Sequence, residues 1–237
     1  MTLPVYYYHR VGPFRDGAPL RLNVSPEAFR EHMAVVARRA HPVTLDALVE
    51  CAREGKPFPR GAVAVTFDDG YRDLMEFALP VLQEFRIPAA FFVVTGGIGA
   101  TDAWNRIEGL PNEPIMAWDD LKRLRDAGMT IGSHSATHAP FDGLDQVKLR
   151  PEISGSKLVL EKRLGMAVRH FAYPQGRFTP EAEVIVRSSG YDAGWATRKG
   201  RPLAPGNLTA VRRVPVSSFI RGPRFRWELF LMRVGIR

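Results

Sequence analysis

Apolar and polar positions along the chain follow two periods, one typical of strands and one typical of helices. Short runs rich in β-branched and aromatic residues predict strands, and apolar residues recurring three and four positions apart predict helices. The predicted strands cover residues 3–9, 62–67, 89–94, 129–132, 168–173, 192–197 and 211–216. The predicted helices cover residues 26–40, 45–53, 71–85, 118–127, 145–164 and 180–188.

Capping signals and the order of these elements indicate the fold class. Ser25 and Pro26 stand where an N-cap and a first-turn residue are expected, and Gly128 is a C-cap signal after residues 118–127. Strands that alternate with helices of ten or more residues predict βαβ units and a parallel sheet. About seven such units in a chain of this length favour an α/β fold with a closed or nearly closed barrel.

Composition supports a globular protein with one barrel, which we expect to span residues 1–216. The chain has 237 residues, of which 45% are hydrophobic and 24% charged, so a sizeable core is expected and disorder is not. The single cysteine, Cys51, excludes a disulfide framework and a cysteine-based metal site. The N-terminus does not resemble a signal peptide and no apolar run reaches the length of a membrane span, so we expect a cytoplasmic protein.

The positive charge is concentrated at the C-terminus. The net charge is +8, and residues 212–237 contain seven arginines and one acidic residue. We expect residues 217–237 to form a basic, hydrophobic helix that is part of the barrel or appended to it. Two interpretations of residues 224–237 stay open: packing on the barrel, or peripheral contact with an anionic membrane at its inner face. Because no recognition motif accompanies the charge, we expect no nucleic-acid partner.

Two segments that follow predicted strands carry residues suited to metal chemistry. Asp68 and Asp69 are adjacent carboxylates, which are costly unless a cation or a proton separates them, although Asp-Gly is also an ordinary turn. His134 and His138 can converge on one ion if the segment forms a helical turn, and otherwise are loop histidines. The C-terminal ends of parallel barrel strands share one face. Two histidines and one aspartate there would supply three zinc ligands, with the other aspartate as a base.

A third segment and a tryptophan are weaker candidates. Residues 171–176 end in a Pro-Gln-Gly turn, which either offers a backbone N–H to a developing oxyanion or simply connects a strand to a helix. Trp195 is predicted either to line an acyl-binding pocket or to pack in the core.

The sequences Thr-Phe-Asp-Asp-Gly, His-Ser-Ala-Thr-His and Phe-Ala-Tyr-Pro-Gln-Gly, in this order, resemble the polysaccharide deacetylase family, also called NodB-homology or carbohydrate esterase family 4. The resemblance implies a distorted barrel of the (β/α)7 type, the NodB-homology fold. It implies that Asp69, His134 and His138 bind one divalent metal ion, usually Zn²⁺. It also implies that Asp68 is the general base and that the N–H of Gln175 helps form an oxyanion hole.

Two positions depart from the pattern of many family members. Ala172 stands where they carry an arginine that orients the base, and no histidine follows His170 to act as the acid. A branch of the family that begins with Tyr-His-x-Val resembles residues 8–11 of this chain. That branch takes its acid from the N-terminal histidine, which makes His9 the expected general acid.

The resemblance implies a metal-dependent hydrolase that removes the N-acetyl group from an amino-sugar-containing glycan or glycoconjugate. The alternatives are a deformylase or O-deacetylase of a lipid-linked saccharide, or a catalytically idle carbohydrate-binding protein. The residues expected to contact substrate are Tyr173, Pro174, Trp195 and Arg213. Arg212 or Arg213 is also the candidate to replace the missing orienting arginine.

Overall fold

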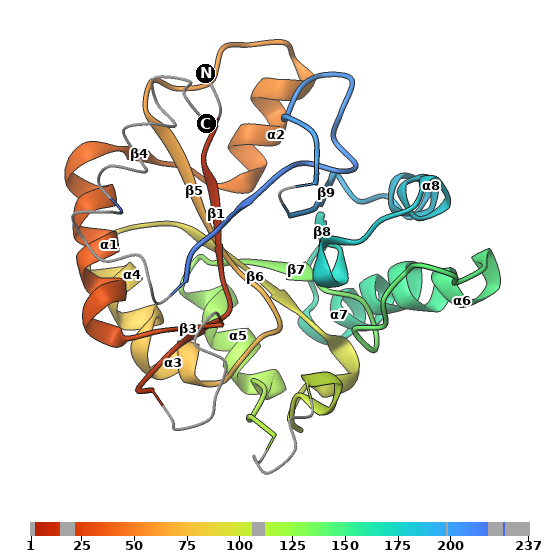
Figure 1. Cartoon of the computed structure of the whole chain (residues 1–237), viewed down its shortest axis with the longest axis horizontal. Helices are drawn as coiled ribbons and strands as arrows, with labels where there is room; N and C mark the ends of the chain where they lie inside the picture. The colour runs from red at the N-terminus through yellow and green to blue at the C-terminus, as the bar shows by residue number, and fades with distance from the viewer. Residues whose placement is uncertain (1–2, 15–21, 106–111, 198, 218–224, 226–237) are drawn as a thin grey trace.

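One parallel sheet of eight strands forms the centre of the fold (Figure 1). The computed structural model describes residues 3–14, 22–105, 112–197 and 199–217, together with residue 225. The strand order is β10-β1-β5-β6-β7-β8-β9, and β4 pairs with the start of β5. The strands are β1 (Val5–Tyr8), β4 (His41–Pro42), β5 (Ala62–Phe67), β6 (Ala89–Val93), β7 (Thr130–Ser133), β8 (His170–Ala172), β9 (Ala193–Trp195) and β10 (Val214–Pro215). A separate parallel pair joins β2 (Arg10–Val11) to β3 (Asn23–Val24).

Helices lie outside the sheet, and side-chain caps define where several of them begin. The α-helices are α1 (Pro26–Arg39), α2 (Leu45–Arg53), α3 (Asp73–Phe77), α4 (Leu79–Glu84), α5 (Trp118–Asp126), α6 (Gln146–Arg150), α7 (Ser156–Leu164) and α8 (Pro180–Ser188). Short helical turns are η1 (Thr95–Gly97), η2 (Ala103–Asn105), η3 (Pro151–Gly155) and η4 (Pro174–Gly176). The Ser25 hydroxyl accepts a hydrogen bond from the amide of Ala28 at 3.2 Å, as the capping signal predicts.

Two predicted helices are interrupted, and a proline lies at each interruption. The helix predicted over 71–85 is divided into α3 and α4 around Ala78, two residues before Pro80. The helix predicted over 145–164 contains the π turn η3, which begins at Pro151. Proline has no amide hydrogen and crowds the preceding turn, so regular α-helical bonding breaks at such positions.

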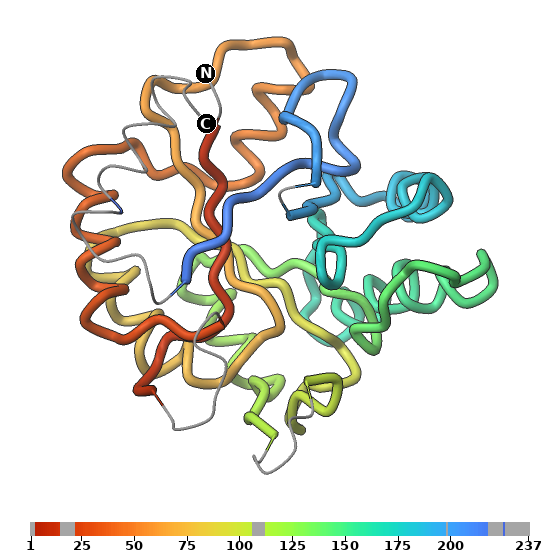
Figure 2. The backbone as a smooth tube through the Cα atoms, viewed as in Figure 1, coloured from red at the N-terminus to blue at the C-terminus, as the bar shows by residue number. Residues whose placement is uncertain are grey.

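The segment 211–216 joins the two edges of the curled sheet. Ala196 N–H donates to the carbonyl of Val211 at 2.7 Å, and Val211 N–H donates to that of Gly194 at 2.8 Å, which links the segment to β9. Further along, Val214 pairs with Tyr6 of β1. In Figure 2 the blue part of the tube accordingly crosses to β1. The predicted α/β class and the curled sheet of a distorted barrel are therefore confirmed.

Side chains alternate between the inside of the barrel and the helices. Ala62 and Ala64 of β5 face the interior with Phe92 and Trp195, whereas Val63, Val65 and Phe67 belong to the cluster packed against the surrounding helices. This is the period of two expected of a strand with both faces covered. Helix α2 closes the N-terminal end of the barrel, where its apolar side chains pack on Val5 and Ala62. The opposite end, at the strand C-termini, is the open one.

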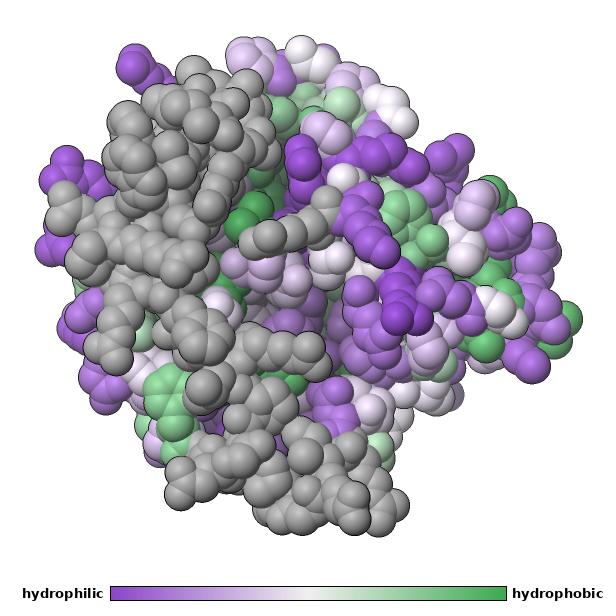
Figure 3. Space-filling view, in the orientation of Figure 1, coloured by the Kyte–Doolittle hydropathy of each residue, from purple (hydrophilic) through white to green (hydrophobic). Residues whose placement is uncertain are grey.

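Most of the C-terminal segment lies outside the described residues. The expectations for 217–237, including contact between 224–237 and a membrane, therefore stay predictions. Phe225 is 1% exposed and packs on the rings of Tyr6 and His32, with centroid distances of 5.1 and 4.3 Å. No helix among the described residues is both long enough and apolar enough to span a membrane. The surface over α6 and α8 is mainly hydrophilic, with isolated apolar residues such as Val147 and Val184 (Figure 3).

Candidate active site

A cavity of about 550 Å³ opens where the strands end at their carboxyl termini. Its side chains come from the C-terminal ends of β1, β5, β7, β8 and β9, from the long loop between β6 and α5, and from Leu22, which precedes β3. The lining residues are Tyr7, His9, Leu22, Asp68, Asp69, Asn105, His134, His138, Gln175, Gly176, Arg177 and Thr197. A cavity of this size suits a small ligand or one unit of a larger one.

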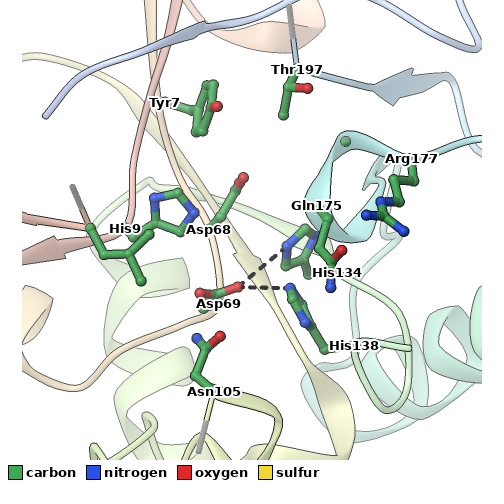
Figure 4. A pocket seen from close by; sticks show the side chains of 12 residues that line it. Tyr7, His9, Asp68, Asp69, Asn105, His134, His138, Gln175, Arg177 and Thr197 are labelled. Carbon is green, nitrogen blue, oxygen red and sulfur yellow. Dashed lines mark ion pairs between the residues drawn. The ribbon is translucent and has the colours of Figure 1, made fainter. Parts of the chain in front are cut away.

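A sharp turn after β5 separates the two carboxylates. Asp69 has a φ of 69° and Gly70 a φ of 80°. A Cβ atom on Gly70 would lie 2.9 Å from Cγ1 of Val93, so this position requires glycine both for its conformation and for space. As a result Asp68 and Asp69 leave the same strand end in different directions (Figure 4).

Both predicted histidines converge on Asp69. Nε2 of His134 and Nε2 of His138 each lie 3.4 Å from Oδ1 of Asp69 (Figure 4). Nδ1 of His134 lies 2.8 Å from the carbonyl oxygen of Ala172, so Nδ1 carries a hydrogen and Nε2 faces Asp69. One ligand atom from each of the three residues lies within 4.8 Å of the others.

The donor set fits a divalent cation. Oδ1 of Asp69 is buried, and no hydrogen bond from any described residue reaches it. Burial raises the pKa of Asp69, but the imidazoles of His134, His9 and His138 outweigh burial and keep the pKa well below its ordinary value. Burial and the neighbouring His134 lower the pKa of His138 to about 4, so its ring is neutral near pH 7. Imidazole nitrogens and a carboxylate oxygen are ligands that zinc and similar ions prefer.

Asp68 is held by a buried arginine. The Nη1 and Nη2 atoms of Arg213 donate to the two carboxylate oxygens of Asp68 at 2.7 and 2.8 Å. Nη1 of Arg213 also donates to Oγ1 of Thr66, and Nε donates to the carbonyl of Ala196. Burial raises the pKa of Asp68, but Arg213, with help from His134 and His9, holds that pKa below its ordinary value. Asp68 is therefore a fixed, ionised carboxylate beside the three candidate metal ligands.

His9 and Gln175 lie on opposite sides of the ligand cluster. Figure 4 shows His9 beside Asp68 on one wall of the cavity and Gln175 on the other. His9 follows β1, and its ring contacts that of Tyr7 edge-on at 5.6 Å. Gln175 lies in η4 with a φ of 56°. Gly176 could not carry a side chain, because a Cβ there would meet Oγ1 of Thr197 at 2.1 Å.

Backbone strain is concentrated around the cavity. Five non-glycine residues in the described chain have positive φ, and four of them belong to the site segments: Asp69, Ser135, His138 and Gln175. Left-handed backbone costs a side-chain-bearing residue energy and persists only where its surroundings determine it. Such strain is typical of functional sites.

Four residues that were expected to contact substrate lie outside the cavity lining. Trp195 is fully buried inside the barrel, where its Nε1 donates to Nδ1 of His170 at 3.3 Å. On the same face of the chain, Thr197 lies two residues further on and does line the cavity. Tyr173 points to the opposite face, packs in the helix-side core and donates its hydroxyl proton to the carbonyl of Thr209.

Pro174 and Arg213 are the other two residues that lie outside the lining. Pro174 is buried at the start of η4 and does not reach the cavity. Arg213 is fully buried and contacts Asp68 instead of the cavity. Of the two arginines considered for pairing with Asp68, Arg213 makes this contact and Arg212 is half-buried.

Several lining residues were not foreseen. Tyr7 and Thr197 follow from the period of two, since each lies two positions from a predicted inward residue on its strand. Asn105 lies in the loop between β6 and α5, and its Nδ2 donates to the hydroxyl of Tyr71 at 2.8 Å. That hydroxyl donates in turn to Asp102, so a chain of polar contacts holds Asn105 at the cavity wall. No sequence signal marks Asn105.

Comparison of the sequence with known proteins finds a family of deacetylases. The family model described as Polysaccharide deacetylase matches residues 55–194. A putative polysaccharide deacetylase, YxkH, of Bacillus subtilis is 26% identical over 225 residues, covering 94% of this chain and 74% of that protein. The poly-beta-1,6-N-acetyl-D-glucosamine N-deacetylase of Staphylococcus aureus is 22% identical over 184 residues, covering 74% of this chain and 61% of that protein.

Solved structures share the fold over nearly the whole chain. IcaB from Ammonifex degensii superposes with a TM-score of 0.80 at 26% identity and covers 96% of this chain and 97% of that structure. The Streptococcus pyogenes deacetylase PplD superposes with a TM-score of 0.82 at 20% identity, covering 97% of this chain and 98% of that structure.

Proposed function

This chain belongs to the polysaccharide deacetylase family, and from that premise we propose that it removes N-acetyl groups from amino sugars in a glycan, using one bound Zn²⁺ ion. One observation carries the proposal: an ionised Asp68 lies beside three clustered ligands, Asp69, His134 and His138, in a cavity that also contains His9. A base, a metal site and an acid are the parts that amide hydrolysis requires.

The proposed metal site consists of Asp69, His134 and His138. A divalent cation held by these residues would supply Lewis acidity toward the acyl carbonyl and would lower the pKa of a water molecule. Asp68 accepts the proton of the attacking water, and Arg213 keeps its carboxylate ionised and oriented. The N–H of Gln175 donates to the carbonyl oxygen as negative charge develops on it.

His9 supplies the proton that the leaving amine requires. The amine leaves as a neutral group only if its nitrogen is protonated as the carbon–nitrogen bond breaks. His9 lies on the cavity wall next to Asp68, so it can deliver this proton from the side of the leaving group (Figure 4). The products are acetate and the free amino sugar.

The test of the proposed function is metal-dependent acetate release. We expect the zinc-loaded protein to release acetate from N-acetylglucosamine oligomers, with β-1,6-linked oligomers as the first choice because the staphylococcal relatives are named for that polymer. Chelation should abolish the release and added zinc should restore it. N-formylated and O-acetylated saccharides serve as comparison substrates. Zinc-loaded protein that releases no acetate from any N-acetylated glycan would contradict the proposal.

Replacing His9 with alanine is expected to lower kcat for an N-acetylated glycan by about 100-fold, the lower end of what a general acid contributes. The cause is the loss of the proton donor, so zinc content should not change. The loss of kcat should be smaller with 4-nitrophenyl acetate as the substrate, because its leaving group departs without protonation. His41→Ala, at an exposed histidine in β4, is the matched control. An unchanged kcat in His9→Ala would assign the acid to another group.

A further inference from the structure

The loop 134–138 holds both histidine ligands in a strained conformation. Ser135 and His138 have φ values of 70° and 62°, in the left-handed region that favours glycine. Neither is a glycine, so contacts with the surroundings must fix this backbone. The direction in which His138 projects depends on those contacts.

The carbonyl groups of the loop are held from the side of β6. The amide of Thr95 donates to the carbonyl of Ser135 at 3.1 Å, and the amide of Gly96 donates to that of Ala136 at 2.8 Å. A Cβ atom on Gly96 would lie 2.7 Å from the carbonyl oxygen of Ala136. The backbone segments at Gly96 and Ala136 therefore approach each other as closely as a glycine allows. This contact fixes one side of the loop.

The amide groups of the loop are held by one carboxylate on the other side. Oε2 of Glu152 accepts hydrogen bonds from the amides of Ala136 and Thr137 at 3.0 and 2.9 Å. Oε1 of Glu152 accepts from the hydroxyl of Thr137 at 2.7 Å. The amide of His138 donates to Oγ of Ser135 at 3.0 Å. The amides of three successive loop residues therefore all have acceptors.

Glu152 is itself placed by the π turn η3 and by a serine pair. It is 8% exposed. Oγ of Ser156, one turn later, lies 2.7 Å from Oγ of Ser133 at the end of β7, and it also donates to the carbonyl of Glu152. These bonds fix the register of the helix against β7, next to the loop. A π turn within a helix is a feature often found at functional sites.

We propose that Glu152 is a positioning residue for the metal site, which fixes the histidine loop by accepting its backbone and hydroxyl hydrogens. Glu152 does not touch the cavity, and its effect reaches the metal through the direction of His138. The inference rests on the proposed function only in that Asp69, His134 and His138 hold a cation. Residues that orient metal ligands from outside the ligand sphere typically change metal affinity when they are replaced.

The test is the zinc affinity of the metal-free protein, measured by competition with a chromophoric chelator. Glu152→Ala and Glu152→Asp are expected to weaken zinc binding about 10- to 100-fold, the range found for groups that orient ligands. Aspartate keeps the charge but is one methylene too short to reach the loop. Glu152→Gln keeps the length and an oxygen that accepts both amides, so its affinity should stay within about threefold of wild type.

The matched control is Glu161, on the same helical stretch but away from the histidine loop. Oε1 of Glu161 also accepts a backbone hydrogen, from Val168 at 2.9 Å, and a hydrogen from Lys157 at 2.7 Å. Glu161→Ala should leave zinc affinity unchanged. Thermal unfolding of each metal-free variant reports any general loss of stability. A purely structural role of Glu152 would lower stability without a selective change in zinc affinity.

Two outcomes would overturn the proposal. Wild-type zinc affinity in Glu152→Asp or Glu152→Ala would show that the loop keeps its conformation without the carboxylate. Tighter binding by Glu152→Asp than by Glu152→Gln would assign the effect to charge and not to hydrogen bonding. Zinc affinity is measured without substrate, so the expected ranking supports the proposal even if no glycan is deacetylated.

Discussion

Replacing Asp68 with asparagine is expected to lower kcat by about 10²- to 10⁴-fold, the range that a general base contributes, while zinc still binds. Asparagine has nearly the same shape, but its amide does not accept a proton from the attacking water. The metal ligands stay in place, because Asp68 is bound to Arg213 and not to Asp69 or the histidines. Acetate release and zinc content are measured on the same preparation.

The control for Asp68→Asn is Asp142→Asn. The side chain of Asp142 is 56% exposed and pairs with Arg177, which lines the cavity. This variant therefore changes a carboxylate close to the cavity that takes no part in the proposed reaction. Exposed ion pairs contribute little, and kcat should stay within about twofold of wild type. Turnover by Asp68→Asn that matches Asp142→Asn would remove Asp68 from the role of base. Loss of zinc from Asp68→Asn would instead make Asp68 part of the metal site.

The positions of several strands and the end of the sheet that holds the site could be predicted because both depend on local signals. Residues 62–67 are a continuous buried run and form a strand with those bounds. The carboxylates after it and the histidines after β7 meet because parallel strands end on one face. The expectation for His9 came from the resemblance of residues 8–11 to one branch of the family. The parallel pairing of β1 with β5 places the C-terminal end of β1, which His9 follows, beside that of β5.

Other parts of the site depend on contacts between distant segments, for which the chain carries no local pattern. Glu152 resembles any acidic residue on a helix until the π turn places it against the histidine loop. The sequence left two positions open for Trp195, the wall of a pocket or the core. The indole ring packs inside the barrel, whereas Thr197, two residues further along, lines the cavity.

Arg213 is placed by the segment that closes the barrel. Residues 211–216 cross from β9 to β1 and bring Arg213 to Asp68. Because Ala172 stands where the family resemblance implies an arginine, we infer that Arg213 takes over the orientation of Asp68. The guanidinium lies between the rings of Tyr7 and Phe92, at 4.9 and 5.1 Å from their centroids. One segment thus closes the barrel and carries the arginine that pairs with Asp68.

Replacing Arg213 with alanine is therefore expected to lower the free energy of unfolding by about 3–5 kcal/mol, because it leaves a buried carboxylate without its partner. In the wild type the lowered pKa of Asp68 adds stability above the pKa of an unfolded aspartate, and this stability is lost as the pH falls through the folded pKa. Without Arg213, burial raises that pKa, so the acid limb of the kcat/KM profile should move to higher pH.

Urea unfolding and the pH dependence of kcat/KM measure the two effects of this substitution. Arg213→Lys keeps the charge but not the two-pronged geometry, so intermediate values are expected. Arg212→Ala is the matched control, because Arg212 is the adjacent, half-buried arginine and lines a separate, smaller cavity with Leu3 and Phe58. If Arg213→Ala were as stable as Arg212→Ala and kept the wild-type acid limb, the Asp68 carboxylate would not depend on Arg213 for its ionisation. The base would then have to be oriented by the strand end alone.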